Sequence, residues 1–162
     1  MDVIEMLEGL NCWHVSAGGS TAPSFKLVLG EKVPRAVPLR NVAQPEVFRL
    51  HRGSVELLVW CSWRLQTEDT VLATSDQGPG WVESLARLIN GTVSHVTCSA
   101  PAWDLRLKFV GDMELLVFCD HFDSESSTLE NWELYSPAGV VRAGPGAKLD
   151  EQLAPASLDS SE

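Results

Sequence analysis

The sequence predicts an α+β fold in which a helix followed by antiparallel strands occurs twice. Three observations lead to this prediction. The segment 53–61 (GSVELLVWC) recurs at 111–119 (GDMELLVFC) with six of nine residues identical. Alternating apolar residues surround both copies, and an apolar stripe with helical spacing precedes each of them. We therefore expect an internally duplicated unit that forms a mostly antiparallel sheet or half-barrel, with two helices packed outside.

The first unit begins with a short helix that Asp2 can cap. Its apolar face consists of Val3, Met6, Leu7 and Leu10. A strand with the pair His14-Val15 follows, and Phe25 to Leu29 form one additional strand. The tripeptide at 48–50 is similar to that at 105–107, so we expect it to open the first hairpin.

The second unit contains the clearest hairpin. Leu105, Leu107 and Phe109 alternate with basic residues, which is the period of a half-buried strand. A turn at 110–112 contains a glycine, which tolerates positive φ. The return strand 113–119 is apolar on both faces, and so is its copy 55–61. Both return strands are therefore predicted to lie in the centre of a sheet.

A second helix is expected at the start of the second unit. The run Gly78-Pro79-Gly80 breaks the chain, and Asn90-Gly91 is a left-handed helix end. The apolar stripe between them consists of Trp81, Leu85, Leu88 and Ile89. A strand with the pair His95-Val96 follows. We expect one domain over 1–149, with copies at about 2–76 and 79–146, a disordered tail over 150–162, and room for a short helix near Leu149 and Leu153.

Two segments break the internal symmetry. Residues 31–47 contain three prolines and three basic residues, and we interpret them as an irregular connection. Residues 120–130 form a polar, acidic loop between two strands of the second copy.

Composition excludes several classes of function. The 22 acidic and 12 basic residues give a net charge of −10, which disfavours binding to nucleic acid or to an anionic membrane. The first residues lack the features of a secretory signal, and no apolar run reaches membrane-spanning length. The four cysteines are widely spaced, which favours a reducing cytoplasm.

The acidic loop is the first candidate site. Its carboxylates are Asp120, Asp123, Glu125 and Glu130. Their spacing, with His121, does not match a calcium loop, and zinc would need further ligands beyond Cys119 and His121. We therefore expect no metal or cofactor. The loop would instead present acidic groups to a basic protein partner.

A pocket between the two halves is the second candidate site. His14 and His95 occupy matching positions, as do Trp63 and Trp132, so these four side chains could line a site for a small ligand. No nucleophile elbow or phosphate-binding loop is found, and we expect a protein that is not an enzyme. Self-association through exposed strand edges is a further expectation.

A family resemblance supports a binding function. Its motifs are LRL (105–107), GD (111–112), LLVF (115–118), ENWEL (130–134), PAGVV (137–141) and GPG (144–146). Over residues 85–146 the chain resembles small bacterial families of unknown function, and some similar proteins are immunity proteins of polymorphic toxin systems. The resemblance implies an intracellular single domain without known catalysis and assigns no role to any residue. The leading hypothesis is a cytoplasmic protein-binding domain, such as an immunity-type toxin inhibitor.

Overall fold

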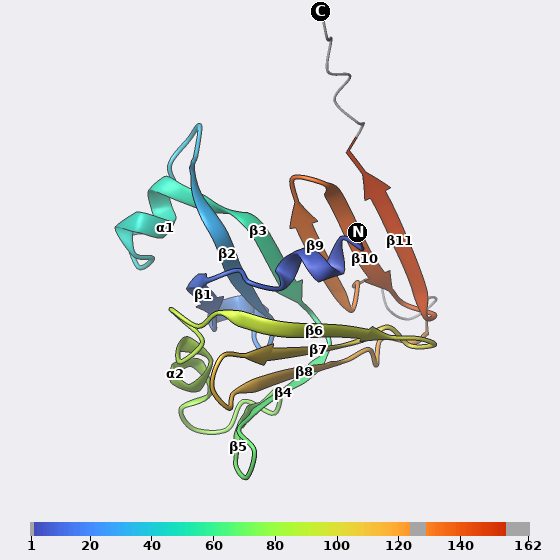
Figure 1. Ribbon diagram of the computed structural model, residues 1–162. Helices are drawn as coiled ribbons and strands as arrows, with labels where there is room; N and C mark the ends of the chain where they lie inside the picture. The colour runs from blue at the N-terminus through green and yellow to red at the C-terminus, as the bar shows by residue number, and fades with distance from the viewer. Residues whose placement is uncertain (1, 124–128, 155–162) are drawn as a thin grey trace, which may run out of the picture.

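Two antiparallel sheets make up most of the computed structural model, which describes residues 2–123 and 129–154 (Figure 1). The first sheet contains, in spatial order, β1 (Cys12–Ala17), β2 (Phe25–Pro34), β3 (His51–Val59), β9 (Trp132–Ser136), β10 (Gly139–Gly144) and β11 (Lys148–Leu153). The second contains β5 (Val71–Thr74), β4 (Ser62–Gln66), β8 (Glu114–Phe118), β7 (Asp104–Phe109) and β6 (Val93–Ser99). The helices are η1 (Ile4–Leu7), η2 (Gly19–Thr21), α1 (Glu46–Leu50) and α2 (Trp81–Ala86). The coarse α+β, antiparallel prediction is confirmed, with strands dominating.

Five strands of the first sheet have the same order as the five strands of the second, and β11 is an additional edge strand of the first sheet. In the first sheet, β1, β2 and β3 are followed by the hairpin β9–β10 from the second half of the chain. In the second sheet, β6, β7 and β8 are followed by the hairpin β4–β5 from the first half. Each half of the chain therefore contributes strands to both sheets.

The two return strands are central, as predicted. Leu57 of β3 lies opposite Leu27 of β2, and Leu115 of β8 lies opposite Leu107 of β7. On their other sides, β3 pairs with β9 and β8 pairs with β4. The apolar residues on one face of each strand enter the core between the sheets, where Leu57 and Leu115 are fully buried.

The prediction that residues 48–50 open the first hairpin is wrong. They lie in α1, which begins after Pro45 and buries only Phe48. The strand that pairs with β3 is β2, whose residues 25–29 occupy the place that 105–109 occupy beside β8. Three residues are too few to distinguish a strand period from one turn of helix.

The predicted disordered tail begins too early, and the short helix near Leu149 is not formed. Residues 148–153 form β11, in which Leu149 lies opposite Ala143 of β10. Gly146 and Ala147 both have positive φ and turn the chain back along the edge of β10. The rest of the predicted tail, residues 155–162, lies outside the described residues.

The space between the sheets holds one continuous core. Its largest fully buried side chains include Trp63 of β4 and Trp132 of β9. The Trp63 indole nitrogen donates to the carbonyl of Pro23, and that of Trp132 donates to the carbonyl of Trp103, each at 2.9 Å. Phe25 of the first sheet meets Trp63 of the second edge to face, with ring centroids 5.2 Å apart.

Backbone bonds also cross between the sheets, at the starts of β1 and β6. Asn11 and Thr92 form an antiparallel bridge. The Cys12 N–H donates to the carbonyl of Gly91 at 2.8 Å, and the Val93 N–H donates to the carbonyl of Leu10 at 3.0 Å. Next to this crossing, η1 packs on β6 and α2 packs on β1. Among the described residues, no helix has the length and apolar content needed to cross a bilayer.

Candidate functional site

The four residues of the predicted pocket do not come together. Trp63 and Trp132 lie in the core, with at most 1% of their surface exposed, so neither can line an open pocket. His14 is buried on the outer face of the first sheet, beneath α1. His95 lies on β6, and its Nδ1 is 2.8 Å from Glu8. The two histidines occupy matching strand positions but have different neighbours.

The acidic loop is anchored to the sheets at both ends. The Asp120 carboxylate accepts hydrogen bonds from the Ser62 backbone N–H, at 3.2 Å, and from the Ser62 hydroxyl. Asp123 is exposed and Glu130 is half-buried, while Glu125 lies outside the described residues. Asp120 therefore has a structural role at the start of β4, which leaves less of its charge available to a partner.

Asn131 fixes the other end of this loop. Its side chain is 1% exposed and accepts the His121 N–H at 2.9 Å. Its amide group donates to the carbonyls of His121, at 3.3 Å, and of Gly144, at 3.2 Å. The sequence signals Asn131 only by its place before Trp132, and its structural role was not predicted.

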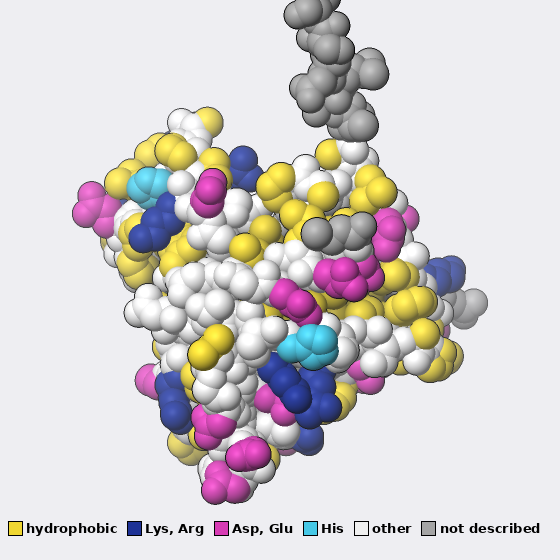
Figure 2. Space-filling view, in the orientation of Figure 1, with side chains coloured by type: hydrophobic (Ala, Val, Ile, Leu, Met, Phe, Trp, Pro, Cys, Tyr) yellow, Lys and Arg dark blue, Asp and Glu magenta, His cyan; other side chains and the backbone are white. Residues whose placement is uncertain are grey.

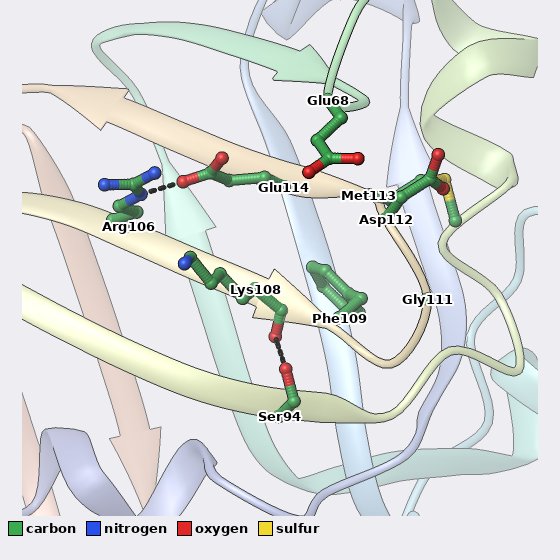
Figure 3. Close-up of a pocket in the computed structure, with 9 residues that line it drawn as sticks. All are labelled: Glu68, Ser94, Arg106, Lys108, Phe109, Gly111, Asp112, Met113 and Glu114. Carbon is green, nitrogen blue, oxygen red and sulfur yellow. Dashed lines mark hydrogen bonds and ion pairs between the residues drawn. The ribbon is translucent and has the colours of Figure 1, made fainter.

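Two depressions of about 410 Å³ lie at the ends of corresponding hairpins. The one beside the β7–β8 turn is lined by charges of both signs (Figure 3). Arg106 forms an ion pair with Glu114, and the Ser94 hydroxyl donates to the carbonyl of Lys108 at 3.1 Å. Among the described residues, no group of three or more His, Cys, Asp or Glu side chains is arranged to hold a metal ion.

The second depression lies where β3 begins, beside Gly53, Ser54 and the β9–β10 turn. An ion pair joins Glu56 at its edge to Lys26, with 3.3 Å between the charged atoms. This pair occupies the same place on β2 and β3 as Arg106 and Glu114 occupy on β7 and β8. Both sheets thus present a similar charged outer surface at this end.

Residues 31–50, which we call the arm, form the end of β2 and its connection to β3. The corresponding connection in the second sheet is the short turn between β7 and β8. Figure 1 shows α1 and the ends of β2 and β3 standing clear of the second sheet. The arm has four basic and two acidic residues in a chain of net charge −10. Its proline and arginine content could have indicated this feature, which the sequence analysis interpreted only as a connection.

The arm also exposes hydrophobic side chains. It contains four of the nine large exposed hydrophobic residues in the described part of the chain: Val37, Val42, Val47 and Leu50. Val42 is 85% exposed and Val37 is 75% exposed. Figure 2 shows hydrophobic side chains gathered over this part of the molecule beside basic ones. Such a concentration is typical of a protein-binding surface.

A small cluster of buried residues attaches the arm to the outer face of the first sheet. The Phe48 ring stacks on His14 with centroids 4.2 Å apart. Arg35 lies over the same ring at 4.9 Å, and its Nε donates to the Phe48 carbonyl at 3.0 Å. Val28 is fully buried but lies outside the main core, because its side chain alternates with the inward-facing Leu27 and Leu29.

This attachment leaves hydrogen-bond donors unmatched. Within the described residues, four buried side-chain nitrogens have no partner: Trp13 Nε1, His14 Nε2, Arg35 Nη2 and Arg49 Nε. All four belong to β1 or to the arm. Leaving a buried donor unpaired costs about 1–3 kcal/mol. The attachment of the arm to β1 is therefore incompletely hydrogen-bonded.

His14, which contacts the arm through Phe48, is expected to make the free energy of unfolding depend on pH. Burial lowers the pKa of His14, Lys26 also lowers it, and a hydrogen bond from the protonated ring to the side chain of Gln44 opposes the change. Arg35 faces the same aromatic cluster and adds positive charge. Because the folded pKa is below 6.5, the unfolded chain binds the proton more tightly, and acid weakens folding.

We expect the free energy of unfolding to rise with pH up to about 6.5 through this residue and then to level off. Urea denaturation at several pH values, for the wild type and for His14→Phe, would measure this contribution. The substitution keeps a stacked ring and should flatten the rise. An equal rise in both proteins would exclude His14 as its source.

Comparison with known proteins finds no match to this chain. No family model, no curated protein and no solved structure matches it.

Proposed function

We propose that this protein is a non-enzymatic, cytoplasmic protein-binding domain, such as an immunity-type toxin inhibitor, and that the arm is its binding surface. The observation that carries the proposal is the coincidence of exposed hydrophobic residues with unmatched buried donors in residues 31–50 and the adjoining β1. Burial of Val37 and Val42 in an interface would contribute favourable free energy, and the arm loses few hydrogen bonds if it rearranges on binding, because several of its buried polar groups have no partner.

The charge of the arm favours a partner with an acidic surface. Lys32, Arg35, Arg40 and Arg49 outnumber the two acidic residues of the arm, whereas the whole chain has net charge −10. An acidic partner would approach the arm selectively, since the remaining surface repels it. The first expectation, a basic partner at the acidic loop, is supported less well because Asp120 is already bound to Ser62.

Paired surface variants test the proposal. In Val37→Ser/Val42→Ser, two exposed residues of the arm lose their apolar side chains. Val71→Ser/Val110→Ser is the matched control, since those valines are 57% and 69% exposed but lie outside the arm. We expect the arm variant to reduce affinity for the natural partner at least about tenfold, or about 1.4 kcal/mol, and the control to retain it.

The partner would be identified by affinity purification with the wild type and then measured by titration calorimetry with both variants. Equal binding by all three proteins would contradict the assignment of the arm. In that case Asp123→Asn/Glu130→Gln would test the acidic loop, because loss of its charge should remove the salt dependence of binding to a basic partner.

A small-ligand-binding module is the second candidate, supported by the two depressions of about 410 Å³ at corresponding hairpins. A ligand with both charges would fit the Arg106 and Glu114 environment. Thermal-shift screening should then show stabilisation that grows with ligand concentration. Substitution of Arg106 by Gln should remove that stabilisation.

We also propose that the chain arose by internal duplication. The shared strand order supports this history, as do the matching places of Trp63 and Trp132 beside the central strands β8 and β3. The reciprocal backbone bonds around Asn11 and Thr92 support it too. A half-barrel form and pairing of two copies through a strand edge remain predictions.

A further inference from the structure

Cys61 and Cys119 lie opposite each other where the chain passes between the two sheets. Cys61 joins β3 of the first sheet to β4 of the second, and Cys119 directly follows β8. In the antiparallel pair β4–β8, Ser62 lies opposite Phe118. The next position in this register pairs Cys61 with Cys119. Both side chains lie on the inner face that carries Trp63, two residues further along β4.

The hydrogen-bond pattern makes Cys61 and Cys119 a non-hydrogen-bonded pair, which is the cross-strand pair with the shorter distance between Cα atoms. The Trp63 N–H donates to the Ser75 hydroxyl at 3.2 Å, and Trp63 accepts the Ser75 N–H at 3.0 Å. The backbone groups of Trp63 thus point away from β8. The direction of the backbone groups alternates along a strand, so residues two apart share it. The backbone groups of Cys61 therefore also point away from β8.

Neither cysteine N–H bonds to the opposite strand. The Cys61 N–H donates to the Asn131 carbonyl at 3.2 Å, and the Cys119 N–H donates to the Asp104 carboxylate at 2.7 Å. In such non-hydrogen-bonded pairs the Cα atoms are about 4.5 Å apart. Disulfides form over Cα separations of about 4.4–6.8 Å. A bond between these two residues therefore requires little backbone movement.

The two thiols already interact. The Cys61 thiol donates a hydrogen bond to Cys119, and this bond together with burial raises the pKa of Cys61. Cys61 is 2% exposed, whereas Cys119 is half-buried and its Sγ lies 3.3 Å from the Trp103 carbonyl. A small oxidant would therefore reach Cys119 first, and Cys61 would remain as the neighbouring thiol that completes the bond.

We propose that Cys61 and Cys119 form a disulfide bond when the protein meets a peroxide. The Cys119 thiolate attacks the peroxide O–O bond and becomes a sulfenic acid, with release of hydroxide. The Cys61 sulfur then attacks the Cys119 sulfur and displaces hydroxide, which leaves as water with the Cys61 proton. Each sulfur loses one electron overall, and the peroxide gains both. Disulfides of this transient kind occur in reducing compartments.

The disulfide would close a loop of roughly 60 residues between the two sheets. It restricts the unfolded chain, and we expect the melting temperature to rise by roughly 5–15 °C. The effect should reverse with dithiothreitol. This inference does not depend on the proposed binding function, because Cys61 and Cys119 lie outside the arm.

Oxidation of the purified full chain with hydrogen peroxide tests the proposal. We expect a mass loss of about 2 Da per chain, a peptide linking Cys61 to Cys119, and the rise in melting temperature. Cys119→Ser and Cys61→Ser should both abolish the linked peptide and the thermal shift. Cys98→Ser is the matched control, since Cys98 is also half-buried with its Sγ near the Trp103 carbonyl, and it should keep both.

Several results would overturn the assignment. These are a disulfide that involves Cys98 instead, oxidation of Cys119 to sulfinic acid without loss of the two hydrogens, or an unchanged mass. Cys119→Ala provides a second test should Cys119→Ser fail to fold. A thermal shift that persists in Cys119→Ala would equally contradict the proposal.

Discussion

Replacing Trp132 by alanine is expected to lower the free energy of unfolding by about 3–5 kcal/mol. The side chain is fully buried between the sheets, and its indole nitrogen donates to the Trp103 carbonyl at 2.9 Å. The substitution creates a large cavity and removes the indole donor to that carbonyl, which then keeps only weak thiol donors. Trp63→Ala should have an effect of the same size, because Trp63 is 1% exposed and donates to Pro23.

Urea denaturation would measure both effects, with Trp60→Ala as the control. Trp60 is half-buried on the outer face of the first sheet, where its indole donates to Glu133 at 3.0 Å. We expect its loss to cost no more than about 1 kcal/mol. Similar costs for Trp60 and Trp132 would show that the core does not depend on the buried tryptophans as described.

Asn131→Ala is expected to destabilise the fold by about 2–4 kcal/mol. The buried amide serves three backbone groups, two of them on His121 and one on Gly144. Its removal leaves these groups without partners near the start of β9. The acidic loop should also become more accessible, and limited proteolysis would detect this change as faster cleavage between residues 120 and 131.

Asn41→Ala is the matched control for this substitution. Its side chain accepts only the Ala43 N–H, at 3.0 Å, and it is exposed within the arm. We expect a cost within about 0.5 kcal/mol and unchanged cleavage of the acidic loop. A loop that is cleaved equally fast in the wild type and in Asn131→Ala would contradict the anchoring role of Asn131.

Local pattern was enough to predict the parts of the fold that are determined locally. The alternation at 105–109, the glycine at 111 and the apolar strand beyond it define β7, a turn and β8. The left-handed residue after α2 was also predicted, and Asn90 has φ +71°. In each case neighbouring residues determine the conformation, so no knowledge of distant contacts was needed.

Pairings between distant segments could not be predicted in this way. Nothing in the period of β9 indicates that it joins β3 rather than β8, because both partners offer the same apolar face. The error at Phe48 has the same origin, since its partner His14 is distant in sequence. Strand β11 was missed for a different reason: it pairs locally with β10, but five of its six residues are exposed and it has no apolar alternation.

The candidate site was predicted less well than the fold. Matching positions suggested a common role for His14 and His95, but the arm covers only His14. The carboxylates of the acidic loop were chosen by composition, which cannot indicate that Asp120 binds Ser62. The arm itself has no period, and its importance depends on exposure and unmatched donors, both of which are tertiary properties.

The exchange of strands between the halves limits how this molecule can change shape. A rigid rotation of one half against the other would have to break the ladder of β3 with β9 and that of β4 with β8, so the fold contains no hinge between its halves. Rearrangement on binding is thereby confined to segments outside the ladders. The part of the arm between β2 and β3, residues 35–50, is where such adaptation can occur without loss of sheet hydrogen bonds.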